Sequence, residues 1–208
     1  MKAIILPSDT KSPAVALAGA MAQIGGVPII FHVIRMLESA GVSKIIVCDN
    51  SDSSELEELL KKSQDKIERA QIEHFRVSSD LKSAQIIEKC RKFDLENTFF
   101  VVPNDVITDL DPEKMMCTHR QNAKCGTVFV CEQREYFGAL GISEDGRYES
   151  KMVNSGFYVL EPEALEYLST NSKIDPELIV ALAENDELFI YSADNFLQRS
   201  NSTSNEEF

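Results

Sequence analysis

In the first half of this 208-residue chain, short apolar runs alternate with longer segments whose apolar residues recur at helical spacing. Most of these runs are rich in Ile, Val and Phe, which is typical of strands that are buried on both faces of a sheet. Because apolar residues at helical spacing separate one run from the next, we predict a parallel sheet covered by helices on both faces. The predicted strands of this half are residues 2–6, 44–48, 72–77 and 98–102.

After residue 125, strands follow one another with little helix between them. The strands predicted there are residues 126–131, 137–142, 155–160 and 188–191. The predicted helices of the whole chain are residues 28–40, 53–69, 83–93, 112–121, 162–168 and 176–183. The length favours one domain over residues 1–199, and the tail over residues 200–208 is rich in Ser, Asn and Glu and is predicted to be disordered and acidic.

The composition argues against several classes of protein. A net charge of −13 disfavours binding to nucleic-acid backbones, where affinity depends on Lys and Arg. No apolar run approaches the roughly 18 residues of a membrane span, and the N-terminus is too short for a signal peptide. The five cysteines form no CxxC pair, so we expect reduced thiols in a cytoplasmic protein with no membrane or nucleic-acid partner. The three histidines are far apart and predict no zinc site.

Ligands of such sheets bind beyond the carboxyl ends of the strands. The loops over residues 7–19 and 103–111 are therefore the candidate binding segments. Asp105 follows a predicted strand directly and is a candidate Mg²⁺ ligand, because Mg²⁺ prefers one or two carboxylates together with phosphate oxygens. For Asp109 and Asp111 the favoured interpretation is that one or the other caps the following helix.

Five segments resemble the sugar-1-phosphate nucleotidyltransferase family. They are MKAIIL over residues 1–6 with GVPIIFH over 26–32 and LESAGVSKIIV over 37–47, VVPNDVITDL over 101–110, and VNSGFYVLEPE over 153–163. The match runs in the family's order from residue 1 to about residue 200, and mannose-1-phosphate guanylyltransferases look most similar. The gamma and epsilon subunits of the guanine-nucleotide exchange factor of translation initiation resemble the chain about as well.

The resemblance implies a three-layer α/β/α, mostly parallel, Rossmann-like sheet. It also implies a reaction in which a sugar 1-phosphate attacks the α-phosphate of an NTP, giving a nucleotide-sugar and pyrophosphate. In that reaction Asp105 would bind Mg²⁺ and Lys11 would contact the triphosphate. The substrate-binding residues it implies are Ser8, Asn154, Gly156 and Glu161.

The signature of the family is degenerate in this chain. The loop after the first strand reads PSDTKSP over residues 7–13, without the family's glycines and arginine. Prolines lack backbone N–H donors, and Asp9 places a negative charge where a triphosphate would bind. The family's lysine aligns with Gly19, and its second metal-binding aspartate aligns with Arg199. An arginine cannot coordinate Mg²⁺.

Two functions follow as hypotheses. The first is a protein that resembles sugar-1-phosphate guanylyltransferases and has weak or no catalytic activity. The second is a non-catalytic regulatory or structural subunit that binds a catalytic homologue or translation-factor subunits, or senses a nucleotide-sugar. Residues 132–208 hold 5 basic and 16 acidic residues, a net charge of −11. That charge has a plain interpretation as a solvated acidic face, but in this family it also weighs against binding a sugar phosphate.

Overall fold

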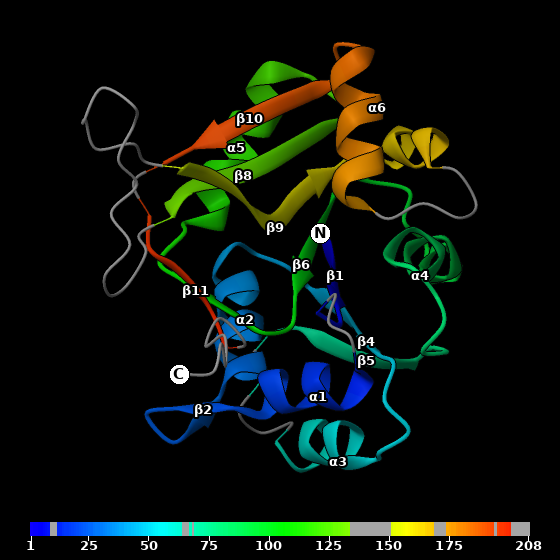
Figure 1. Ribbon diagram of the computed structural model, residues 1–208, viewed down its shortest axis with the longest axis vertical. Helices are drawn as coiled ribbons and strands as arrows, with labels where there is room; N and C mark the ends of the chain where they lie inside the picture. The colour runs from blue at the N-terminus through cyan, green and yellow to red at the C-terminus, as the bar shows by residue number, and fades with distance from the viewer. Residues whose placement is uncertain are drawn as a thin grey trace, which may run out of the picture.

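The computed structural model describes residues 1–8, 12–63, 67, 69–133, 151–168, 174–193 and 195–200. The strands of its central sheet are β1 (Lys2–Leu6), β4 (Lys44–Asp49), β5 (Gln71–Arg76), β6 (Phe99–Pro103), β8 (Gly126–Gln133), β9 (Lys151–Leu160) and β10 (Leu188–Ser192). They lie in the order β10-β8-β9-β6-β1-β4-β5 (Figure 1). Neighbouring strands are parallel except for β9, which is antiparallel to β6 and β8. The predicted, mostly parallel sheet is confirmed.

Helices cover both faces of this sheet. Side chains alternate between the faces along each strand. Ala3 and Ile5 of β1 therefore pack in one cluster with Ile30, whereas Ile4 and Leu6 pack in a second cluster with Ile87. The first cluster contains α1 (Pro13–Met21), α2 (Ile29–Ser39), α3 (Glu55–Lys62) and α5 (Pro112–Asn122), and the second contains α4 (Ser83–Cys90), the 3₁₀ helix η3 (Pro162–Tyr167) and α6 (Ile179–Glu184). The three-layer arrangement is confirmed.

The prediction of a loop over residues 7–19 is wrong, because α1 begins inside it at Pro13. Proline is favoured in a first helical turn, and the sequence PAVALAGAM is rich in alanine, the strongest helix former. The buried residues of α1 are Ala16, Gly19 and Ala20. These small side chains give little hydrophobic periodicity, so the apolar pattern does not reveal the helix.

Other predicted helices are present in the structure but end at different residues than predicted. The helix predicted over residues 53–69 ends at Lys62, and the one over 83–93 finishes as a 3₁₀ turn, η2 (Arg91–Phe93). A single π-helical turn, η4 (Ile174–Leu178), precedes α6. The strand predicted over 137–142 and the tail from residue 201 onward lie outside the described residues.

Two short antiparallel pairs complete the fold. β2 (Gln23–Ile24) pairs with β3 (Val27–Pro28), and β7 (Val106–Thr108) pairs with β11 (Leu197–Arg199). Figure 1 shows that β11 brings the end of the chain back alongside the segment that follows β6. This second pair therefore completes the carboxyl edge of the parallel strands. Among the described helices, none is both long enough and apolar enough to span a membrane.

Candidate functional site

Asp105 lies in the turn between β6 and β7, at the carboxyl edge where the sequence predicts a ligand site. The residue is 1% exposed. Its Oδ1 atom is buried and has no hydrogen-bond partner among the described residues. Burying a carboxylate in this way is unfavourable unless a positive charge compensates it.

Arg199 supplies that positive charge. In the β7–β11 pair Arg199 is opposite Val106, and the next residue, Ser200, donates its backbone N–H to the carbonyl oxygen of Asp105 (3.0 Å). The Nη1 atom of Arg199 lies 3.9 Å from Asp105 Oδ1, and Nη2 donates to the carbonyl oxygen of Ser155 (3.0 Å). The structure thus places Arg199 beside Asp105, as its alignment with a metal-binding position suggests.

Asn154 and Gly156 shape the neighbouring part of β9. The pairing of β9 with β8 is irregular here, and Gly156 has a φ of +84°. The Asn154 side chain accepts a hydrogen bond from the Gly156 N–H (2.9 Å) and donates to the Tyr158 hydroxyl (2.8 Å). Both predicted residues therefore lie next to Ser155, whose carbonyl oxygen binds Arg199.

Ser8 is held by Asn104, which the sequence analysis missed. The Ser8 backbone N–H and hydroxyl both donate to Asn104 Oδ1, at 3.1 and 2.8 Å. Ser8 is 5% exposed and Asn104 is 2% exposed. The sequence signal available was a polar residue in the strand-end turn, since such side chains often bind nearby backbone groups.

The structure does not bring Glu161 to this edge. Glu161 follows β9 and lies at the amino end of β6, where its Oε1 accepts a hydrogen bond from the Thr98 hydroxyl (2.8 Å). Its second contact is with His119 Nε2 at 3.1 Å, and His119 Nδ1 lies 2.8 Å from the Thr127 hydroxyl. Lys11 lies outside the described residues.

The residues that the structure describes at this edge do not fit a Mg²⁺ ion. Mg²⁺ is usually held by one or two carboxylates with phosphate oxygens and water, whereas the pair of Asp105 and Arg199 has no net charge. Asp109 accepts hydrogen bonds from the Asn195 side chain and the Phe196 N–H, and Asp111 caps α5, as predicted. In the part of the chain that the structure describes, no three Asp, Glu, His or Cys side chains gather to hold a metal ion.

A second polar cluster lies farther along the same edge. Asp49, at the end of β4, accepts hydrogen bonds from the N–H and hydroxyl of Ser51 (2.9 and 2.7 Å), and its Oδ2 lies 3.2 Å from His74 Nε2. Burial alone raises the pKa of Asp49, but the hydrogen bonds with His74 and Ser51 outweigh burial and hold the pKa below its ordinary value. This cluster ties β4 to β5.

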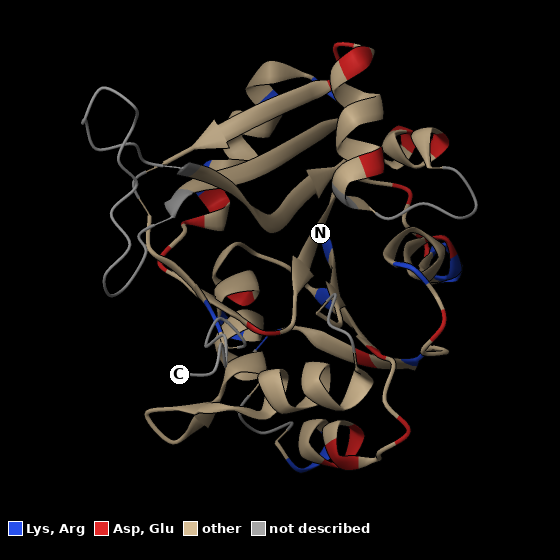
Figure 2. Ribbon diagram, viewed as in Figure 1, with Lys and Arg blue, Asp and Glu red and all other residues tan. Residues whose placement is uncertain are grey.

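The acidic positions of the second half lie partly on helices. Figure 2 shows acidic positions on η3, η4 and α6, which pack on the same face of the sheet as α4. The exposed ones are Glu163, Glu166, Glu177 and Glu184. These positions agree with the interpretation of a solvated acidic face.

The fold is an α/β fold with a mostly parallel sheet, a class whose ligands usually bind beyond the carboxyl ends of the parallel strands. The sequence profile described as "Nucleotidyl transferase" matches residues 16–185, and the chain belongs to that family. The chain is 28% identical over 185 residues to the mannose-1-phosphate guanylyltransferase catalytic subunit beta of Xenopus tropicalis, covering 81% of this chain and 51% of the relative. It thus spans about half the length of that relative.

A more distant relative and a solved structure are also named as sugar-1-phosphate nucleotidyltransferases. The chain is 21% identical over 207 residues to the glucose-1-phosphate cytidylyltransferase of Salmonella typhimurium, covering 86% of this chain and 80% of the relative. Its fold matches the crystal structure of a putative glucose-1-phosphate thymidylyltransferase from Bacillus anthracis with a TM-score of 0.76 at 14% identity, covering 96% of this chain and 89% of that one. The expected family and its fold are confirmed.

Proposed function

We propose that this chain binds an NTP or a nucleotide-sugar at the carboxyl edge of its sheet and transfers nucleotidyl groups weakly or not at all. The observation that carries this proposal is the pairing of Ser8 with Asn104. Nucleotidyl transfer depends on donors that are aimed at the phosphates in advance. Here the loop after β1 starts with Pro7, which has no N–H, and both donors of Ser8 point to Asn104.

The names of the relatives suggest the first ligands to test. They include a guanylyltransferase and a cytidylyltransferase, so the base is an experimental question. The guanylyltransferase has the higher identity of these two, which favours GTP and GDP-mannose as first probes. In this proposal Ser8, Asn154 and Gly156 shape the binding edge.

Calorimetry and a pyrophosphate assay test the two halves of this proposal. We expect heat on titration with GDP-mannose or with one of GTP, ATP, UTP and CTP. We also expect pyrophosphate release from NTP and mannose, glucose or heptose 1-phosphate to be at least about 10²-fold slower than with an active guanylyltransferase, since one lost donor has this effect. No heat at millimolar ligand refutes the binding half, and turnover at the rate of the active enzyme refutes the other half.

A second candidate function is that of a regulatory or structural subunit in the cytoplasm. In the described sheet β10 is an edge strand, its residues Leu188–Ser192 carry no charge, and Ile190 is 57% exposed. An uncharged edge strand presents unpaired backbone groups to a partner. A catalytic guanylyltransferase is the favoured partner, because one relative is itself called a catalytic subunit, and translation-factor subunits are the alternative.

Affinity purification tests this candidate. We expect a catalytic guanylyltransferase to copurify with the wild-type chain and to be lost with Ile190→Lys. Val180→Lys is the matched control, because Val180 is 49% exposed on α6. Retention of the partner by Ile190→Lys contradicts the use of β10, and copurification of translation-factor subunits instead favours the alternative partner.

A further inference from the structure

We propose that the guanidinium of Arg199 is the cation of this site, and that a phosphate-bearing ligand binds beside it without a divalent metal ion. The identity of the ligand rests on the proposed function. The absence of a metal requirement rests on the geometry of Arg199 and Asp105, and it is testable without any nucleotide.

The position of Arg199 is fixed by the fold. Its backbone belongs to the β7–β11 pair, and the following N–H, from Ser200, is bound to the carbonyl oxygen of Asp105. Its guanidinium is held between the carbonyl oxygen of Ser155 at 3.0 Å and the carboxylate of Asp105 at 3.9 Å. A cation held on two sides in this way loses little freedom when it binds a ligand.

Strand β9 leaves space for this guanidinium at Gly156. A Cβ atom on Gly156 would lie 2.7 Å from Arg199 Nη2 and 3.4 Å from Pro103 Cγ. A residue with a side chain at position 156 would therefore displace the guanidinium. The guanidinium of Arg199 is therefore surrounded by three groups, which are Gly156, the carbonyl oxygen of Ser155 and the carboxylate of Asp105.

The charge of this pair disfavours a divalent ion and suits a phosphate. A second carboxylate in place of Arg199 would give the site a charge of −2, whereas the observed pair is neutral. A divalent cation beside the guanidinium would be repelled, and repulsion is strong near buried groups. Arginine has five N–H donors in a planar fork that matches a phosphate, so it can serve more than one acceptor.

The exposed fractions of the two side chains show that Arg199 faces solvent and Asp105 does not. The side chain of Arg199 is 36% exposed, whereas that of Asp105 is 2% exposed. A ligand arriving from solvent therefore meets the guanidinium, and the carboxylate lies behind it. Asp105 holds the arginine in place and does not need to touch the ligand.

Manganese binding tests the metal half of the proposal. Titration of the protein with Mn²⁺ alone, followed by electron paramagnetic resonance, should show no saturable binding up to millimolar metal. Arg199→Asp should gain a saturable Mn²⁺ site, and Arg199→Asn is the substitute if that variant does not fold. Arg35→Asp makes the same charge change at an exposed position on α2 and should gain nothing. Saturable Mn²⁺ binding by the wild type that Asp105→Asn abolishes overturns the proposal.

GDP-mannose binding tests the phosphate half. The dissociation constant should be the same in MgCl₂ and in EDTA. Arg199→Met should weaken binding by about 10- to 100-fold, the range for a lost hydrogen bond to a charged group. Binding that requires Mg²⁺, or that Arg199→Met leaves unchanged, overturns the inference. If GDP-mannose and the NTPs bind under neither condition, the proposed function fails and the phosphate half falls with it, while the Mn²⁺ titration still decides the metal half.

Discussion

The Nη2 atom of Arg199 lies 2.7 Å from the position that a Cβ atom would take on Gly156. Two separate effects therefore oppose Gly156→Ala, namely the clash and the φ of +84°. We expect this substitution to lower the free energy of unfolding by about 1–3 kcal/mol, since the left-handed backbone alone costs about 1–2 kcal/mol and the clash adds less, because Nη2 is the end of a flexible side chain that can shift. Chemical denaturation measures this loss.

Gly41→Ala is the matched control for Gly156→Ala. Gly41 has a φ of +76°, but no atom lies within 4 Å of its added Cβ position. The substitution should therefore show the backbone cost without the clash. Equal losses in the two variants would mean that Arg199 moves away without cost.

Asn104→Ala should destabilise the fold by about 1–3 kcal/mol, because it leaves the buried N–H and hydroxyl of Ser8 without an acceptor. Asn185→Ala is the control, since Asn185 is the exposed C-cap of α6 and, among the described residues, its side chain binds the carbonyl oxygen of Ala181 one turn earlier. We expect its effect to stay within about 0.5 kcal/mol. Thermal denaturation of both variants measures the difference, and a loss at Asn104 as small as that at Asn185 contradicts the role given to this pair.

Asp49 should make stability depend on acid pH. Its pKa in the folded protein is lower than the unfolded value of about 3.9, so ionised Asp49 stabilises the fold above that pH. This contribution is lost as the pH falls through the folded-state pKa. Asp49→Asn should therefore lower Tm at neutral pH and flatten the fall of Tm below about pH 4.

Asp52→Asn is the control for Asp49→Asn, because Asp52 is exposed in the following loop. Tm measured from pH 7 down to pH 2 separates the two variants. A curve for Asp49→Asn that runs parallel to the wild type would contradict the role of the cluster with His74 and Ser51.

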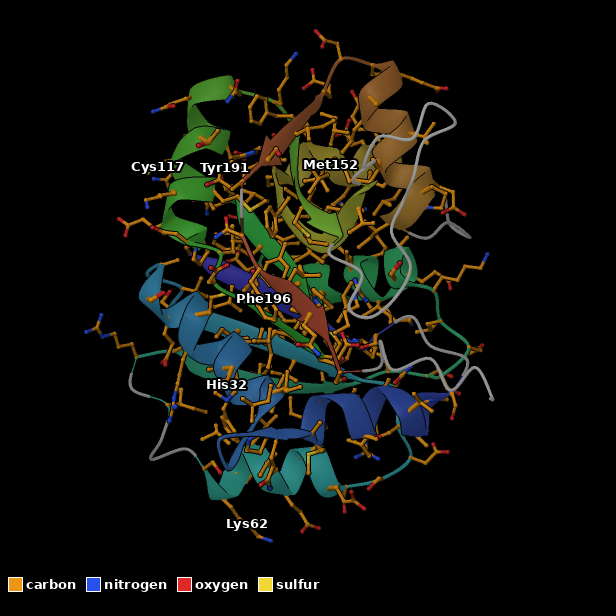
Figure 3. All side chains as sticks on the ribbon, turned by 60° about the vertical axis from the view of Figure 1, so that its left-hand side comes forward. His32, Lys62, Cys117, Met152, Tyr191 and Phe196 are labelled. Atoms are coloured by element: carbon orange, nitrogen blue, oxygen red, sulfur yellow. The ribbon has the colours of Figure 1, made fainter. Side chains whose placement is uncertain are left out.

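Cys117, in the middle of α5, and Cys125, which directly precedes β8, should differ in reactivity. Cys117 is exposed on the outer surface of α5 (Figure 3). Burial, followed by the hydrogen bond with Glu187, raises the pKa of Cys125 to about 11. The thiolate is the reactive form, so at pH 8 a thiol reagent should label Cys117 at least about tenfold faster than Cys125.

Peptide mapping by mass spectrometry measures the two labelling rates. Cys117→Ser should remove the fast phase, whereas Cys125→Ser should leave it. Labelling of Cys125 should accelerate as the pH rises toward 11, because its thiolate then becomes populated. Equal rates at pH 8 would show that Cys125 is not protected.

The layers of the fold follow from local patterns. Apolar runs such as those of β1 and β6 are buried on both faces, so composition alone identifies them as central strands. The position of Asp105 at the carboxyl edge of the sheet was predictable as well, because this residue directly follows the apolar run of β6. Helix α1 was not predictable from periodicity, since its buried face consists of Ala16, Gly19 and Ala20, which carry almost no apolar pattern.

The contacts that decide the chemistry join distant parts of the sequence. Ser8 and Asn104 are 96 residues apart, and nothing in either local segment indicates that one binds the other. Arg199 reaches Asp105 through the β7–β11 pair, two strands of three residues each that are too short to give a recognisable pattern. Glu161 looked like part of the same motif as Asn154, yet β9 carries the two to opposite ends of the sheet.

The hydrogen bond from Ser200 to Asp105 connects the end of the described chain directly to the candidate site. A tag or domain joined to Phe208 is therefore connected to Arg199 through residues 200–208 alone. A pulling force or a bulky protein attached there would disturb the guanidinium of Arg199 before it disturbed the hydrophobic core. The C-terminal side of β11 is thus the place where an attached protein would change ligand affinity most directly, and an N-terminal tag is the better choice for every binding measurement described above.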